Sequence, residues 1–184
     1  MRLRLALACL PLVFSLPASA HTVDLNVGSD TVEGYYSNTL GTSAEWSVGG
    51  LYNRDLKDNL IAGSLLAVGE LGSDTLRSEI GVGGKLYYAT LGNDDLMGIG
   101  LGGQWRVYPG KGPLGFSVYG FYVPEVLTGM DGKNLWELGA RVEFEIIERT
   151  ANIYLGYRQI RVEMENGRRD DLSDSIMGGM RFTF

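Results

Sequence analysis

The stretch that decides the fold is the last ten residues, 175–184, which read SIMGGMRFTF. Every second residue from Ile176 to Phe184 is apolar or glycine, and this two-residue period is typical of a β-strand with one apolar face. The strand closes on an aromatic residue. Together with a secretion signal at the other end of the chain, such a strand indicates a bacterial outer-membrane β-barrel.

The first twenty residues have the parts of a secretory signal peptide. Arg2 and Arg4 supply a basic start, residues 5–16 form an apolar stretch, and residues 18–20, ASA, match a cleavage site. The apolar stretch is shorter than the roughly twenty residues that a membrane-spanning helix needs. We therefore expect residues 1–20 to be a cleaved signal peptide and residues 21–184 to be one outer-membrane barrel domain.

The composition excludes several function classes. Cys9, the only cysteine, lies in the signal peptide, so the mature chain would have neither thiol chemistry nor disulfides. Loss of Arg2 and Arg4 would change the net charge from −6 to −8, and an acidic chain is a poor partner for nucleic acid. Glycine makes up 27 of 184 residues, without a collagen-like period, so glycines are expected inside the strands.

From residue 43 onward the chain alternates between strand-like segments and turn clusters rich in Gly, Asn, Asp and Pro. The expected strands are 43–53, 59–69, 75–89, 95–109, 113–126, 134–147, 151–165 and 174–184. Segments of this length suit tilted membrane crossings, which need about 9–11 residues. We find no helical periodicity beyond the signal peptide.

The number of strands depends on residues 22–37. A turn at residues 28–30 would divide this segment into two short strands and give ten in total. A single bulged strand, or a periplasmic lead, would give eight. Both numbers are even, as is normal for single-chain bacterial barrels. The expected fold is therefore all-β, a transmembrane antiparallel up-and-down β-barrel of ten strands, with eight as the alternative.

If the last strand runs towards the periplasm, the aromatic residues of the apolar face fall into two belts. Tyr52, Tyr88, Tyr122 and Trp136 lie at the outer strand ends, and Trp46, Trp105, Phe116, Phe182 and Phe184 lie towards the inner ends. Membrane interfaces favour such belts, whereas a soluble β-sandwich has no reason to form them. We expect location in the outer membrane, with its lipid as a partner and residues 165–173 as the longest external segment.

The opposite face of the same strands carries charges of both signs. The candidate lumen network consists of Arg77, Glu79, Lys85, Arg106, Glu137, Arg141, Glu143 and Arg158. Glu145 shares their parity, and a slip of register near Gln159 would bring Arg161, Glu163 and Glu165 inside as well. Folding the chain about Gly92 places Lys85 opposite Gly98 and Glu79 opposite Gln104.

Enclosed charges must be paired, and small barrels usually fill their interiors with side chains. The sequence therefore favours a closed barrel with a charge-filled lumen and a structural or surface-interaction role. The alternative is a narrow porin-like channel for ions or small solutes. If these lumen residues pair with one another, neutralising one of them should destabilise the barrel. If they line water, the same substitution should alter ion selectivity with little loss of stability.

Catalytic chemistry has little support in the sequence. His21 is the only histidine, and a catalytic triad needs a histidine held inside the fold. An N-terminal histidine could offer copper only its amine and one ring nitrogen, which makes a weak metal site. The acidic loop residues are explained more simply as charges exposed to water than as ligands of divalent cations. Glycine patterns such as residues 98–103 precede no helix and so do not bind nucleotides. We expect no enzyme activity, no cofactor and no metal site.

Three segments carry a family resemblance: GVGGKLYY at 81–88, FYVPEVL at 121–127 and IYLGYRQI at 153–160. In this order, and followed by Phe184, they resemble the YfaZ family of small outer-membrane proteins over nearly all of the mature chain. Val123 stands where the family pattern has alanine. The resemblance implies a location in the outer membrane of Gram-negative bacteria. It does not point to any established catalytic or transport activity, and it adds no site residues.

The last strand is also expected to be the signal that the barrel-assembly machinery recognises. Its candidate residues are Gly179, Phe182 and Phe184. Met177 departs from this pattern because such signals usually have a polar residue there. The expected partners are thus outer-membrane lipid and, during biogenesis, the assembly machinery.

Overall fold

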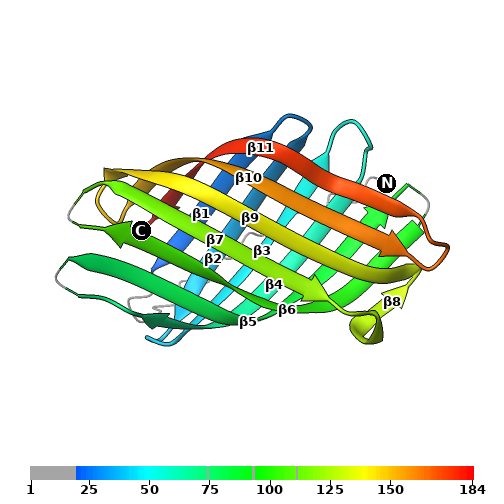
Figure 1. Ribbon diagram of the computed structural model, residues 1–184, viewed down its shortest axis with the longest axis horizontal. Coiled ribbons are helices and arrows are strands. Elements are labelled where there is room, and N and C mark those ends of the chain that lie inside the picture. The colour runs from blue at the N-terminus through cyan, green and yellow to red at the C-terminus, as the bar shows by residue number, and fades with distance from the viewer. Residues whose placement is uncertain (1–19, 74, 93, 111) are drawn as a thin grey trace, which may run out of the picture.

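The computed structural model describes residue 20 onward, except residues 74, 93 and 111, and shows a closed antiparallel β-barrel (Figure 1). The expected signal peptide lies almost wholly outside the described residues. Ten long strands form the wall. They are β1 (His21–Gly28), β2 (Thr31–Leu40), β3 (Ala44–Asn53), β4 (Asn59–Glu70), β5 (Leu76–Leu91), β6 (Asp94–Pro109), β7 (Leu114–Val123), β9 (Gly132–Ile147), β10 (Ala151–Met164) and β11 (Arg169–Thr183).

Each long strand pairs with the next one along the chain, and β1 pairs with β11 to close the barrel. The closing seam runs from Thr22 opposite Thr183 to Gly28 opposite Met177. Residues 22–37 form two strands joined at Ser29 and Asp30, so the prediction of ten strands is confirmed and the alternative of eight is wrong.

The chain leaves the wall briefly between β7 and β9. The segment predicted as a strand over 113–126 ends at Val123, because Pro124 has no N–H for the ladder. A 3-10 turn, η1 (Glu125–Leu127), follows and projects sideways from the wall (Figure 1). The short β8 (Thr128–Met130) then pairs with β6 beyond the end of β7. Among the residues described, no helix is long and apolar enough to cross a membrane.

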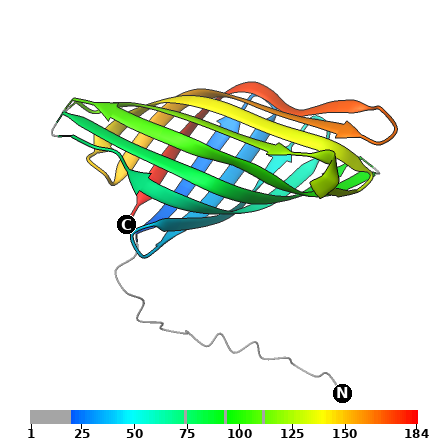
Figure 2. The same ribbon diagram turned by 60° about the horizontal axis from the view of Figure 1, so that its bottom comes forward.

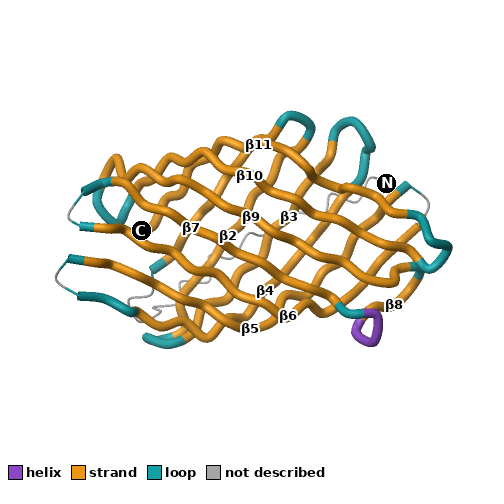
Figure 3. Tube along the Cα trace, viewed as in Figure 1, coloured by secondary structure: helices purple, strands orange, loops and turns teal. Residues whose placement is uncertain are grey.

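The loops lie at the two ends of the barrel (Figure 3). We call one the terminal end because both chain termini of the barrel meet there (Figure 2): His21 N donates to Phe184 O at 2.9 Å, and Phe184 N donates to His21 O at 2.8 Å. The opposite end is the distal end. It carries the connections 29–30, 54–58, 92–93, 124–131 and 165–168.

The register slip lies in β11 and not in β10. Ile160 pairs with Ser173 and Arg161 with Asp171, so the extra residue in the ladder is Leu172. β10 therefore keeps one inward parity to its end at Met164, and the prediction that Arg161, Glu163 and Glu165 enter the lumen is wrong. The inward positions are Ile160, Val162 and Met164, each fully buried. β11 also begins at Arg169, which shortens the predicted external segment, because Arg161 pairs with Asp171 across the extended ladder.

The hairpin between β5 and β6 is two residues out of the expected register. Leu91 pairs with Asp94, which leaves a two-residue connection, and Gly92 has a φ of 67° that suits such a turn. Lys85 consequently lies opposite Gly100, and Glu79 lies opposite Arg106. The expected partners, Gly98 for Lys85 and Gln104 for Glu79, were therefore wrong by two residues, because the turn is centred one residue later than predicted.

Candidate functional site

The lumen has an apolar layer near the distal end. Inward side chains from the distal parts of eight strands form a contiguous cluster, none more than 3% exposed. We call this cluster the distal core: Leu51, Leu60, Ala62, Ala89, Leu91, Leu96, Val123, Leu135, Ile160, Val162, Met164 and Leu172. Strand alternation turns these side chains inward, where they have no access to water. This layer was not predicted, because in the sequence its residues share their parity with the charged residues of the same strands.

The charged layer begins directly below the distal core with a lysine in an aromatic cage. Lys85 Nζ lies 2.8 Å from Glu137 Oε2, and both residues are buried. Tyr87 donates its hydroxyl proton to the same carboxylate oxygen over 2.7 Å. The ammonium also lies 4.9 Å from the centre of the Tyr35 ring and 5.3 Å from that of Phe121. Rings at this distance stabilise a cation that has been removed from water.

Arg158 is the largest side chain with no solvent exposure, and every one of its nitrogens finds a partner. Its Nη1 pairs with Glu33 and lies 3.2 Å from Asn26 Oδ1. Its Nη2 donates to Thr31 Oγ1 at 3.0 Å, and its Nε donates to Ser173 Oγ at 3.2 Å. This complete set of bonds compensates for the burial of a guanidinium.

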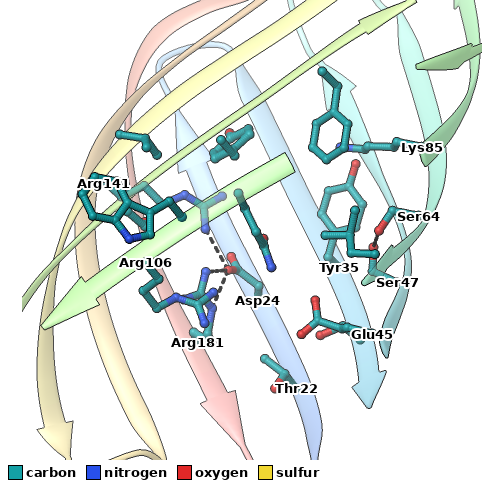
Figure 4. Close-up of a pocket in the computed structure, with 18 of the residues that line it drawn as sticks. Thr22, Asp24, Tyr35, Glu45, Ser47, Ser64, Lys85, Arg106, Arg141 and Arg181 are labelled. Carbon is teal, nitrogen blue, oxygen red and sulfur yellow. Dashed lines mark hydrogen bonds and ion pairs between the residues drawn. The ribbon is translucent and has the colours of Figure 1, made fainter. Parts of the chain in front are cut away.

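A second group of ion pairs lies nearer the terminal end (Figure 4). Asp24 accepts from Arg141 Nη1 at 2.9 Å and from Arg181 Nη2 at 2.8 Å, and the Tyr154 hydroxyl donates to its other oxygen. Arg181 continues to Glu143, with 3.1 Å between Nη1 and Oε2. One carboxylate on β1 is thus linked to arginines on β9 and β11, across the closing seam.

Glu143 is fully buried and is the most heavily bonded carboxylate of this group. Besides Arg181, it accepts from the Tyr108 hydroxyl at 2.7 Å and from Ser117 Oγ at 2.6 Å. Arg106 approaches it to 3.8 Å and also pairs with Glu79 at 3.1 Å. Both oxygens of this carboxylate are therefore occupied by hydroxyl or guanidinium donors.

The eight residues of the candidate network therefore all lie on the inner face of the wall. Arg77 pairs with Glu145, and Glu79, Lys85, Arg106, Glu137, Arg141, Glu143 and Arg158 take the partners described above. Three partners were missed: Asp24, Glu33 and Arg181. Asp24 and Arg181 alternate with apolar neighbours in the sequence, so parity alone would have found them.

A cavity of about 150 Å³ remains among these groups. Thr22 and Thr183 line it near the terminal end, and Ser47 and Ser64 line it from β3 and β4, where their hydroxyls lie 2.7 Å apart. Glu45, Ser37 and Gln104 are among the other polar side chains that face it (Figure 4 labels Glu45). The cavity has polar and aromatic walls and has room for several water molecules.

The family model described as "YfaZ precursor" matches residues 1–184 of the chain. The chain belongs to the YfaZ family. No curated protein sequence matches it.

Among solved structures, this YfaZ family member is similar to two porins. The "KdgM porin in complex with disordered oligogalacturonate" matches with a TM-score of 0.47 and 8% identity, over 90% of this chain and 99% of that chain. The "NanC porin structure in rhombohedral crystal form" matches with a TM-score of 0.44 and 10% identity, over 90% and 98% of the two chains.

His21 of the YfaZ family barrel is held at the terminal end. Its Nδ1 lies 2.5 Å from the Tyr36 hydroxyl and 3.1 Å from Asn38 Nδ2, and its ring stacks on Phe184 with centres 5.9 Å apart. Within the described part of the chain, no group of three His, Cys, Asp or Glu residues could hold a metal ion.

The three candidate assembly residues divide between the two faces of β11. Phe182 and Phe184 point outwards, whereas Gly179 points into the lumen. A Cβ on Gly179 would come within 2.4 Å of the Tyr154 ring and 2.6 Å of the Leu25 carbonyl oxygen. The glycine therefore makes room for the tyrosine that bonds Asp24, which gives it a packing role in the YfaZ family barrel.

Proposed function

We propose that this protein is an integral outer-membrane barrel that does not conduct in its resting state. Its role is structural or interactional at the cell surface, without enzyme activity. The terminal end faces the periplasm and the distal end faces outside.

The exterior of the wall supports membrane insertion. Every long strand carries exposed apolar side chains on its outer face, for example Leu65 at 58%, Leu101 at 61% and Leu155 at 64%. A water-soluble protein rarely exposes an apolar surface that surrounds it completely. Outward aromatics also gather towards both ends: Tyr52, Tyr88 and Tyr122 near the distal end, and Trp105, Phe116 and Phe182 near the terminal end. This arrangement suits a membrane, in which the apolar band contacts the hydrocarbon and the two aromatic groups lie at the two interfaces.

The single observation that carries the non-conducting state is the distal core. A water-filled pathway would have to cross a layer in which Leu91, Leu96 and Leu135 have no solvent exposure. Below that layer, Lys85, Arg158 and Arg181 are each bonded to a lumen carboxylate, so ions that used these groups would have to displace existing partners. Both layers favour a filled lumen over a pore.

A non-enzymatic role is supported by the same bonds. Glu143 and Glu137 are the most enclosed carboxylates, and both are occupied by cations and hydroxyl donors. The one histidine lies at the terminal mouth, far in sequence from these carboxylates. Comparison of lipid A and phospholipid profiles in cells with and without the gene tests this part, and a reproducible change in acyl groups would contradict it.

Planar-bilayer recording of the purified protein is the decisive experiment. We expect no stable conductance steps from the wild-type protein. A variant that removes distal core side chains, Leu91→Ala with Met164→Ala, should conduct more than the wild type if that layer is the barrier. Stable wild-type steps whose selectivity shifts with Lys85→Gln would instead establish the alternative, a narrow channel. The polar cavity of 150 Å³ is the observation that favours this alternative.

Membrane insertion and assembly have their own tests. The protein should stay in membranes washed with urea or carbonate, and its release would overturn the barrel's membrane location. Deletion of Phe184 should leave protease-sensitive material in the periplasm, because the terminal aromatic would no longer engage the assembly machinery. Full assembly without Phe184 would remove that residue from the recognition signal.

A further inference from the structure

The lumen is open to solvent at the terminal end and closed at the distal end. At the terminal mouth the inward side chains of Glu79 and Arg77 are 35% and 32% exposed, whereas no side chain of the distal core is more than 3% exposed. The cavity of about 150 Å³ lies between these two levels. Thr22 and Thr183 line it towards the mouth, and Tyr35, which packs against the distal core, lines its inner end. The cavity thus lies in a cup that solutes reach from the terminal end only.

Two buried groups in the wall of this cavity have no hydrogen-bond partner among the described residues. They are the Tyr35 hydroxyl of β2 and Gln104 Nε2 of β6. The Nε atoms of Arg106 and Arg141, which line the same cavity, also lack one. All four groups can donate a hydrogen bond, and buried donors in folded proteins are normally satisfied by an acceptor. An occupant of the cavity that carries oxygen atoms would supply this acceptor.

The charges of the wall argue against an ion as the occupant. The cations of the wall are already paired with carboxylates, and they are Lys85, Arg106, Arg141 and Arg181. A further anion would therefore meet those carboxylates without a free cation of its own. A cation is disfavoured in turn, because the unpartnered nitrogens carry protons and have no lone pair to offer.

A neutral hydroxyl group suits this wall better than either ion, because it both accepts and donates. Its oxygen can accept from Tyr35 or Gln104. Its proton can go to Glu45, whose carboxylate faces the cavity and forms no ion pair with the residues that the structure describes (Figure 4). Ser47 and Ser64, with their hydroxyls 2.7 Å apart, offer a second place for such a group.

We propose that the cup binds one small neutral polyol of about the size of glycerol. A cavity of about 150 Å³ holds a solute as large as benzene, so the volume is sufficient. The rings of Tyr119 and Phe121 also line the cavity and give the carbon skeleton an apolar surface to contact. This inference rests on the proposed function for the compartment alone: with the terminal end towards the periplasm, the polyol comes from the periplasm.

Saturation-transfer NMR of the purified barrel, in a detergent without a sugar headgroup, tests this site. The probes are glycerol, acetate and methylammonium, which are small solutes of neutral, negative and positive charge. Titration of each probe gives its dissociation constant. We expect the wild type to bind glycerol and to bind both ions more weakly.

Two matched pairs of variants locate the binding. Tyr35→Phe removes only the unpartnered hydroxyl, and Tyr36→Phe is its control, because Tyr36 turns to the outer face and bonds His21. Gln104→Leu removes the unpartnered amide, and Gln159→Leu is its control on the outer face of β10. Tyr35→Phe and Gln104→Leu should each weaken glycerol binding about fivefold, through the loss of one hydrogen bond. Both controls should bind glycerol as the wild type does.

Tyr35→Phe and Gln104→Leu remove groups that bond no other residue, so both variants should fold, and heat-modifiable migration checks this. Absence of glycerol binding by the folded wild type would mean that water alone occupies the cavity, and would overturn the inference. Equal glycerol binding by the wild type and every variant, or tighter binding of either ion, would also overturn it. Conductance steps from a wild type that binds glycerol as expected would defeat the closed state of the proposed function and leave this site standing. A closed barrel that binds no glycerol would defeat only this site.

Discussion

The distal core and the charged layer fill the same lumen by opposite means. On β9, Glu137 is bonded to Lys85, whereas Leu135, the next inward residue, is packed in the distal core. On β10, the change from Arg158 to Ile160 takes the same single step. Apolar side chains can fill space beside any apolar neighbour, but each buried charge needs one particular partner. The two layers should therefore respond differently to substitution.

The largest effect is expected when one member of a buried pair is removed. Glu137→Ala should destabilise the barrel by about 3–5 kcal/mol, because Lys85 would remain buried without its carboxylate. Urea unfolding of the protein in detergent, followed by tryptophan fluorescence, measures this loss. Glu79→Ala is the matched control: the side chains of Glu79 and Arg106 are 35% and 22% exposed, and such pairs contribute about 1 kcal/mol or less.

The double variant Lys85→Met with Glu137→Leu sharpens the same comparison. It converts the pair into an extension of the distal core and should recover much of the loss seen with Glu137→Ala. If the double variant is no more stable than Glu137→Ala alone, the cost comes from lost packing around the aromatic cage and not from an unpaired charge.

Truncation in the distal core should cost less than loss of a charge and should not depend on a partner. Leu91→Ala is expected to destabilise by about 2–4 kcal/mol through lost burial and the cavity left behind. The same urea titration applies. Ile61→Ala, on the outer face at 58% exposure, removes comparable carbon and should have a much smaller effect. Equal losses for the two variants would mean that the lumen gains nothing from this layer.

The glycine contact inside the seam should give a smaller effect. Gly179→Ala is expected to cost about 1–3 kcal/mol, because its Cβ would overlap the Tyr154 ring. Gly178→Ala is the control on the same strand, since its nearest contact would be the Tyr154 carbonyl oxygen at 3.9 Å. A thermal shift of the heat-modifiable band reports both. Tyr154→Leu should relieve the part of the Gly179→Ala penalty that comes from the ring, whereas the contact with the Leu25 carbonyl oxygen at 2.6 Å would remain.

The smallest effect is expected at the distal loops. Arg168 pairs with Asp94 at 3.0 Å and with Asp170 at 2.8 Å, but its side chain is 46% exposed. Arg168→Gln should therefore change stability by less than about 1 kcal/mol, and 0.5 M salt should remove even that difference. A loss as large as that of Glu137→Ala would show that exposure is a poor guide to the strength of these pairs.

Much of the architecture could be predicted from the sequence, because a two-residue period specifies both a strand and the face of each residue. The turn at Ser29 and Asp30 was enough to prefer ten strands, and ten were found. The errors fell where periodicity carries no information. Leu172 bulges from β11, and neither strand of that pair shows in sequence which one holds the extra residue.

The lumen was harder to predict than the wall. Parity indicates which residues enter it, but partners such as Glu33 and Arg158 come from strands 125 residues apart. Their pairing depends on shear and tilt, which local pattern does not contain. The distal core was missed for another reason. Its leucines and valines look like any strand residues until closure of the barrel places them together.

The closing seam also bears on how the chain folds. The hydroxyls of Thr22 and Thr183 bond across a sequence separation of 161 residues. β1 lies between β2 and β11, so without β11 one of its edges has no partner. A contact over this separation carries a high loop-closure entropy and a high contact order, which slow folding. Of the described strands, β11 is the last along the chain, so until β11 has been synthesised β1 keeps an unpaired edge open to other chains. Closure of the ring between β1 and β11 should therefore be the slowest step of folding.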